Sequence, residues 1–195
     1  MAGQFTGSAK GKEPVGQRKI RMPLEIRPPK EQWQPPPLGW AKVNVDGAFS
    51  QETGKGGIGV VIRDHHGVPV LCSWRAVLRC SSAAVVEALA CKEGVALAAE
   101  WVRDRVIVES DCINIVDAIH QGSNRSELCF TLQEVKEISR LLPEVRVQAV
   151  RREQNGAAHE LAQLAKRTLH TAVWRTRVPS CIEHLIAHDC NVIND

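Results

Sequence analysis

The order of strand and helix patterns after Trp40 constrains this chain more than any other feature of its sequence. Residues 42–46 alternate polar and apolar side chains, which is typical of a strand with one buried face. Residues 56–63 and 70–77 are rich in β-branched side chains, and the turn-forming residues 66–69 separate them. Three consecutive short strands joined by turns predict an antiparallel meander.

A different pattern follows the meander. Residues 81–103 repeat apolar side chains at helical spacing, with Ser81 or Ser82 available as the N-cap. The rest of the sequence predicts a strand over 105–111, helices over 113–120 and 128–142, a strand over 145–150 and a helix over 157–169. This order predicts an α/β fold with a mixed five-stranded sheet, in which three antiparallel strands precede parallel βα units, and with helices on both faces.

Residues 1–39 have a different composition. They contain much Gly, Lys and Pro and end in the run Gln34-Pro35-Pro36-Pro37. A segment with so few apolar side chains cannot bury enough surface to offset its chain entropy. We therefore expect a disordered, basic, proline-rich tail over 1–39 and a single domain over 40–195.

The positive charge of the chain is concentrated in this tail. Seven Lys or Arg residues and three Glu residues precede Trp33, a balance of +4, whereas the whole chain carries +3. Basic side chains in such a segment can bind phosphates in a salt-dependent way. The alternative is a tail that only increases solubility. The tail residues predicted to contact nucleic acid are Lys10, Lys12, Arg18, Lys19 and Arg21.

Composition excludes several other classes of protein. No apolar run reaches the roughly 18 residues that a membrane-spanning helix needs, so no membrane partner is expected. The first 25 residues lack the apolar block of a secretory signal, which predicts an intracellular protein and leaves nucleus, cytoplasm and organelle open. The seven cysteines are scattered without a C-x-x-C pair, which indicates buried thiols instead of a disulfide framework or a zinc site.

Three acidic residues stand at informative positions. Asp46 ends the first strand pattern, just before Gly47, and Asp111 ends the fourth. Glu87 lies in the first turns of the long helix, among Ala and Val, where a carboxylate is costly to bury unless it is paired or metal-bound. Each has an ordinary alternative, since Asp46 could be a turn residue, Glu87 a solvated helix residue and Asp111 a helix N-cap.

Taken together, the three acids predict a metal site. If the first and fourth strands are adjacent and parallel, Asp46 and Asp111 emerge side by side at the sheet edge where functional groups collect in open α/β sheets. Carboxylates converging there repel one another without a cation, and Mg²⁺ prefers oxygen ligands. Two such ions about 4 Å apart can promote phosphodiester hydrolysis.

The sequence also resembles a known family. The motifs that carry the resemblance run in order along the chain over residues 42–49, 56–64, 86–90, 108–112 and 152–162. In this order they closely resemble the ribonuclease H-like domains of plant proteins related to non-LTR retrotransposons. The similarity extends from about Trp33 to near the C-terminus and includes Trp174 and Pro179.

The resemblance implies an activity and a ligand set. It implies endonucleolytic hydrolysis of the RNA strand of an RNA–DNA hybrid with two Mg²⁺ ions, leaving 3′-hydroxyl and 5′-phosphate ends. Asp46 would then bridge both ions, and Glu87 and Asp111 would each help to hold one. It says nothing about the oligomeric state.

Two positions depart from ribonucleases H proper. His159 stands where they have a fourth catalytic Asp, and imidazole is a poorer ligand for Mg²⁺ than for Mn²⁺. Ala149 stands where the family usually has a His, and losing a general acid or base costs on the order of 10²-fold in rate. We therefore expect catalysis to be weak, with His159 in the catalytic set. Glu160, next to His159, is a poor substitute for the fourth Asp because one helical step turns its side chain about 100° away. Glu109 lies on the same strand face as Asp111 and is a candidate for a supporting carboxylate.

Two other functions are weighed against hydrolysis. A binding module that grips nucleic acid without cutting is favoured by His159 and Ala149 and opposed by the retained carboxylates. A 3′–5′ exonuclease of the same broad fold is disfavoured, because those enzymes carry D-x-E on the first strand, whereas this chain has Asp46-Gly47-Ala48. Two structural expectations complete the predictions. Asn155 is predicted to cap the last helix, with Arg152 and Glu153 as structural residues that pair across its start. The predicted core aromatics are Trp40, Trp74 and Trp101.

Overall fold

The computed structural model describes residues 1, 3, 32–121 and 127–191. Within these ranges the chain forms one six-stranded sheet with the strand order β5-β4-β1-β2-β3-β6. Strands β1, β2, β3 and β6 pair antiparallel, whereas β1–β4 and β4–β5 pair parallel. The strands are β1 (Trp40–Ser50), β2 (Lys55–Arg63), β3 (Pro69–Val77), β4 (Arg105–Ser110), β5 (Val145–Ala149) and β6 (Ala172–Arg175).

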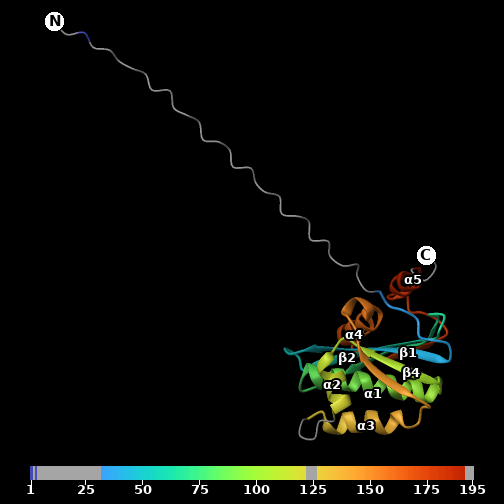
Figure 1. The fold of residues 1–195 in the computed structure, drawn as a ribbon. Helices are drawn as coiled ribbons and strands as arrows, with labels where there is room; N and C mark the ends of the chain where they lie inside the picture. The colour runs from blue at the N-terminus through green and yellow to red at the C-terminus, as the bar shows by residue number, and fades with distance from the viewer. Residues whose placement is uncertain (2, 4–31, 122–126, 192–195) are drawn as a thin grey trace.

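Helices cover both faces of this sheet, as predicted. Figure 1 shows α1, α2 and α3 on one side of the strands and α4 and α5 on the other. One buried apolar cluster joins the sheet to α1, α2 and α3, and a second joins it to α4 and α5. The helices are α1 (Ala83–Trp101), α2 (Ile113–Gln121), α3 (Cys129–Ser139), α4 (Gly156–Thr168) and α5 (Glu183–Asn191), with a 3-10 turn η1 (Arg152–Gln154) before α4.

The strand register places Asp46 differently from the prediction. Strand β1 does not end at Asp46, because its pairing with β2 continues to Ser50 opposite Lys55. Its parallel partner β4 ends at Ser110, so Asp46 lies mid-strand beside the point where the neighbouring strand stops. The adjacency of β1 and β4, on which the predicted convergence of Asp46 and Asp111 depends, is confirmed.

Two glycines let helices approach the sheet closely. A Cβ atom on Gly47 would lie 2.7 Å from the backbone nitrogen of Glu87, so the absence of a side chain lets α1 approach β1. A Cβ atom on Gly59 would lie 2.1 Å from the carbonyl oxygen of Ala158 in α4. Real Cβ atoms do not approach backbone atoms so closely, so glycine at these two positions brings the starts of α1 and α4 toward Asp46 from opposite faces.

The packed part of the chain begins before Trp40, contrary to the predicted boundary. Trp33 is 1% exposed, and residues 32–39 run against the domain. The composition of the proline run is typical of a disordered tail, so the sequence did not predict this packing. The side chain of Trp33 nevertheless holds the segment to the domain. The remainder of the predicted tail, 2 and 4–31, lies outside the described residues.

Three further features differ from the predictions or refine them. The sixth strand β6 and the helix α5 were not predicted. Strand β6 has four residues, too few to show an alternating pattern, and the nine residues of α5 are only weakly amphipathic. Trp40 and Trp74 are buried, but Trp101 is 41% exposed at the end of α1, where the Arg175 guanidinium lies 4.2 Å above its ring. All seven cysteines are free, as predicted, but only Cys72 and Cys91 are buried, and the other five are partly exposed.

None of the helices in the described part of the chain is long and apolar enough to span a bilayer.

Candidate active site and metal centre

Three carboxylates from three separate elements meet at the end of β4. Asp46 of β1, Glu87 of α1 and Asp111 after β4 each place a ligand oxygen within 4.8 Å of those of the other two. Asp46 is 3% exposed, and Glu87 and Asp111 are half-buried. The sequence therefore identified the members of this cluster correctly. In the described ranges it is the single group of three or more potential metal ligands with this spacing.

Local contacts fix the position of Glu87. Ser82 is the N-cap of its helix α1, and the Ser82 hydroxyl accepts a hydrogen bond from the backbone N–H of Val85 at 3.3 Å. The Gly47 backbone N–H donates to Oε2 of Glu87 at 3.2 Å. Gly47 thus provides both the space for α1 and a hydrogen bond to its carboxylate.

The electrostatics of the cluster favour protonation when no cation is present. Burial first, and then the charges of Asp46 and Asp111, raise the pKa of Glu87 to about 8. Burial and the charge of Asp111 raise the pKa of Asp46 to about 6, although His159 partly opposes the shift. Groups that resist ionisation in each other's presence are expected where a bound cation normally balances their charge.

His159 enters the cluster from α4. Its Nδ1 lies 2.8 Å from Oδ2 of Asp46, and the ring is partly exposed. The Nη2 atom of Arg152 lies 3.0 Å from Nε2 of the same ring. Because a carboxylate only accepts, the proton of the contact with Asp46 lies on Nδ1, whereas Arg152 lies against the ring, with the same Nη2 atom 3.2 Å from Nδ1. Arg152, predicted to be structural only, thus contacts a residue of the site.

Asn155 does not cap α4 with its side chain, contrary to the prediction. The side chain is 1% exposed, and its Nδ2 donates to the Val45 carbonyl oxygen at 2.8 Å and to Oδ1 of Asp111 at 3.3 Å. The Asn155 oxygen, which a cap would use, accepts instead from Nδ2 of Asn44 at 3.2 Å. It connects the backbone beside Asp46 to the carboxylate of Asp111.

The other carboxylates considered from the sequence lie outside the cluster. Glu109 is 2% exposed, and it accepts from Asn44 at 2.9 Å and pairs with Lys42 at 2.8 Å. Glu160 pairs with Arg167 at 3.0 Å on the outer side of α4. Ala149 ends β5 and is exposed. Its methyl side chain cannot accept or donate a proton.

The predicted nucleic-acid residues are not part of this geometry. They fall within 4–31, outside the described residues, and remain a prediction. They are Lys10, Lys12, Arg18, Lys19 and Arg21.

This fold is that of a ribonuclease H-like domain. A family model described as "Reverse transcriptase-like" matches residues 44–165, more than half of the chain. The chain therefore belongs to the reverse transcriptase-like family and carries a ribonuclease H-like domain. No protein of curated function matches the sequence significantly.

Solved structures support the fold independently. The N-terminal RNase H domain of a Mycobacterium tuberculosis protein superposes with a TM-score of 0.61 at 19% identity, covering 66% of this chain and 94% of that one. RNase H1 from the archaeon Halobacterium salinarum gives a TM-score of 0.61 at 19% identity, over 65% and 97%. LC11-RNase H1, solved in complex with an RNA/DNA hybrid, gives 0.58 at 23% identity, over 66% and 98%.

Proposed function

We propose that this protein is a metal-dependent endoribonuclease that hydrolyses the RNA strand of RNA–DNA hybrids. The observation that carries the proposal is the convergence of the Asp46, Glu87 and Asp111 oxygens within 4.8 Å. Two of the solved structures with this fold are RNase H1 enzymes, and one of these was solved with a hybrid bound.

The donor set fits a hard divalent cation. All three groups offer oxygen atoms, which Mg²⁺ and Mn²⁺ prefer, and the raised pKa values of Asp46 and Glu87 mark a charge that the protein alone does not balance. Asp46, Glu87 and Asp111 would hold the metal. When bound, divalent ions there would promote attack of water on the phosphodiester and stabilise the leaving oxygen.

The remaining residues position and complement this set. Asn155 donates to Asp111 and so orients its carboxylate toward the cluster. Arg152 is exposed beside His159 and offers a fixed positive charge where a phosphate would approach. Arginine stays protonated at any working pH, so Arg152 can bind a phosphate oxygen but cannot replace the proton-transfer group that Ala149 lacks.

His159 bears on the choice of metal and on the rate. An imidazole beside Asp46 supplies no negative charge to a second ion, and it suits Mn²⁺ better than Mg²⁺. Together with Ala149, it predicts a slow enzyme that works better with Mn²⁺.

A second candidate is a binding module of the same fold that no longer cleaves. The contact between His159 and Asp46, 2.8 Å long, favours it because it engages a carboxylate oxygen that a metal would otherwise use. The three retained carboxylates oppose it, since without a metal they repel the phosphates that such a module would bind.

Cleavage of a labelled RNA–DNA hybrid with Mg²⁺ and, separately, Mn²⁺ tests the proposal, with Asp46→Asn as the control. We expect metal-dependent cutting confined to the RNA strand, faster with Mn²⁺ and lost in the control. Binding of the hybrid without cutting under either metal would instead support the binding module.

The basic tail is proposed to strengthen binding of the hybrid. Deletion should spare Gln32, because its carbonyl oxygen accepts from Gln154 at 3.3 Å within the packed part of the chain. Removing residues 2–31 should therefore test the tail alone, through hybrid affinity measured over a range of salt concentrations.

A further inference from the structure

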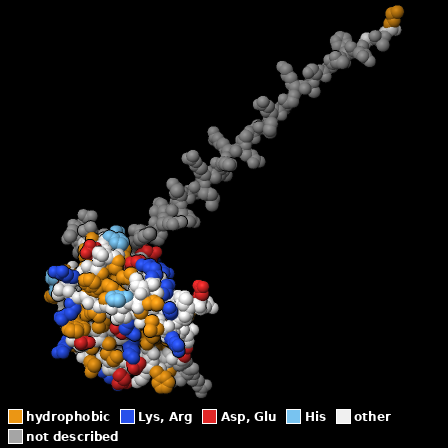
Figure 2. Space-filling view, turned by 180° about the vertical axis from the view of Figure 1, so that it is seen from behind, with side chains coloured by type: hydrophobic (Ala, Val, Ile, Leu, Met, Phe, Trp, Pro, Cys, Tyr) orange, Lys and Arg blue, Asp and Glu red, His pale blue; other side chains and the backbone are white. Residues whose placement is uncertain are grey.

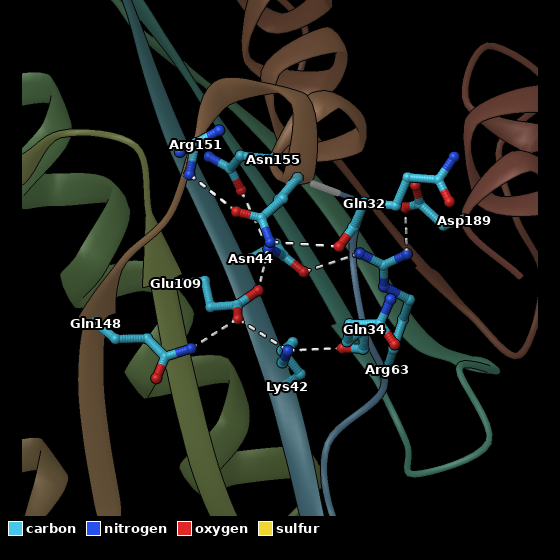
Figure 3. A network of polar contacts seen from close by, with 11 residues as sticks. Gln32, Gln34, Lys42, Asn44, Arg63, Glu109, Gln148, Arg151, Asn155 and Asp189 are labelled. Atoms are coloured by element: carbon cyan, nitrogen blue, oxygen red, sulfur yellow. Dashed lines mark hydrogen bonds and ion pairs between the residues drawn. The ribbon is translucent and has the colours of Figure 1, made fainter. Parts of the chain in front are cut away.

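A line of polar side chains crosses the domain from α5 to the carboxylate cluster. Figure 3 shows it running from Asp189 through Arg63 and Asn44 to Asn155. All four are buried, with exposed fractions of 9%, 1%, 1% and 1%. Asn155 then donates to Asp111, so three intervening side chains separate the C-terminal helix from a member of the cluster.

Arg63 is the centre of this line. Its Nη1 pairs with Oδ2 of Asp189 at 2.7 Å, and its Nη2 donates to Oδ1 of Asn44 at 2.9 Å. The guanidinium carbon lies 3.4 Å from the centre of the Trp33 ring. A buried guanidinium is costly unless it is paired and hydrogen-bonded, so Arg63 requires both α5 and the segment around Trp33 to be in place.

Along this line, the donor or acceptor character of each side chain sets the orientation of the next amide. An amide side chain can be turned over, exchanging its oxygen and nitrogen, unless its partners forbid it. Arg63 only donates and the Glu109 carboxylate only accepts, so together they hold the Asn44 oxygen toward Arg63 and its nitrogen toward Glu109 at 2.9 Å. The same nitrogen donates to Oδ1 of Asn155 at 3.2 Å. The Asn155 nitrogen must then face Val45 and Asp111.

We propose that Arg63 is a positioning residue, and that α5 and the segment around Trp33 act through it to orient Asn155 toward Asp111. Both elements lie outside the family match at residues 44–165, so this protein extends the shared domain with parts that order its site. The metal-binding consequence rests on the proposed function; the orientation of Asn155 does not.

The test compares Asp189→Ala, which removes the partner of Arg63, with Asp189→Asn, which keeps an oxygen to accept from it. Val135→Ala is the stability control, because Val135 is buried in α3 within the other apolar cluster. Two properties are measured in folded protein. They are the side-chain amide resonances of Asn155 in a ¹⁵N-labelled, metal-free sample, and the Mg²⁺ concentration at half of its thermal stabilisation.

We expect Asp189→Ala to shift the Asn155 resonances and to raise the Mg²⁺ midpoint by about tenfold. Loss of contacts that support metal ligands weakens metal affinity by about 10- to 100-fold, and tenfold is the lower end of that range. Asp189→Asn should retain the wild-type resonances and a midpoint within about threefold of wild type, as expected from its preserved acceptor. Val135→Ala should leave both unchanged while lowering the melting temperature. If Asp189→Ala does not fold, Asn44→Ser interrupts the same line and should give the same two changes.

Folded Asp189→Ala with unshifted Asn155 resonances would overturn the inference, and so would equal changes in the Val135→Ala control. If the wild-type protein neither cleaves hybrids nor responds to Mg²⁺, the proposed function fails. The Asn155 resonances then decide the inference alone.

Discussion

The Glu87→Gln substitution should stabilise the metal-free protein at alkaline pH. In the folded state the pKa of Glu87 is raised from its ordinary value of 4.5 to about 8, first by burial and then by the charges of Asp46 and Asp111. An unfolded chain loses this proton near pH 4.5. The folded state therefore binds more protons between about pH 4.5 and 8, and its stability falls as pH rises through that window.

The size of the effect follows from the shift. A rise from 4.5 to about 8 sets an upper limit of about 5 kcal/mol at high pH. Glu87 is only half-buried, so solvent screens its charge and about 2 kcal/mol is the expected gain on removing that charge. For a domain of this size that corresponds to an increase of about 4–8 °C in melting temperature. Glutamine keeps an oxygen that can accept from the Gly47 N–H.

Thermal unfolding in a chelator at pH 5 and pH 8.5 measures the gain. The variant should melt well above the wild type at pH 8.5 and close to it at pH 5, and added Mg²⁺ should stabilise the wild type far more than the variant. Glu100→Gln, an exposed change on the same helix, should alter neither comparison. The reasoning is refuted if Glu87→Gln lowers the melting temperature at pH 8.5, or if the variant keeps the full response to Mg²⁺.

Four further outcomes are expected. Asp46→Asn should reduce hybrid cleavage by more than about 100-fold with either metal, measured as initial rates on folded protein. His159→Asp should raise the Mg²⁺-supported rate by about tenfold and reduce the preference for Mn²⁺; an unchanged metal preference would show that position 159 does not contact the metal. Gly59→Ala should destabilise the fold by about 1–3 kcal/mol in denaturant titrations, since its Cβ would lie 2.1 Å from a backbone oxygen of α4. Gly156→Ala is the control and should leave the free energy of unfolding unchanged, because nothing lies within 4 Å of a Cβ at that position. Deletion of residues 2–31 should weaken hybrid binding at low salt and have a vanishing effect at high salt; equal affinities at low salt would assign the tail no role in binding.

The sequence by itself determined the order of the elements from β1 to α4 and the members of the carboxylate cluster. Alternation over 42–46 and helical spacing over 81–103 are local signals, and they located β1 and α1. The strand pattern ending at Asp111, together with the rule that parallel neighbours share an edge, was enough to bring Asp111 next to Asp46. Family resemblance then supplied the expected chemistry.

Only the tertiary structure decided which polar side chains support that cluster. Arg63 and Asp189 are separated by 126 residues, and Asn44 and Asn155 by 111, so no local pattern relates them. In sequence, Arg63 resembles a solvated strand end, Trp33 belongs to a proline-rich tail, and Asn155 precedes a helix as a cap would. Each is instead buried, because a polar group enters the interior only where distant parts of the chain supply its hydrogen-bonding partners, and those partners exist only once the chain has folded.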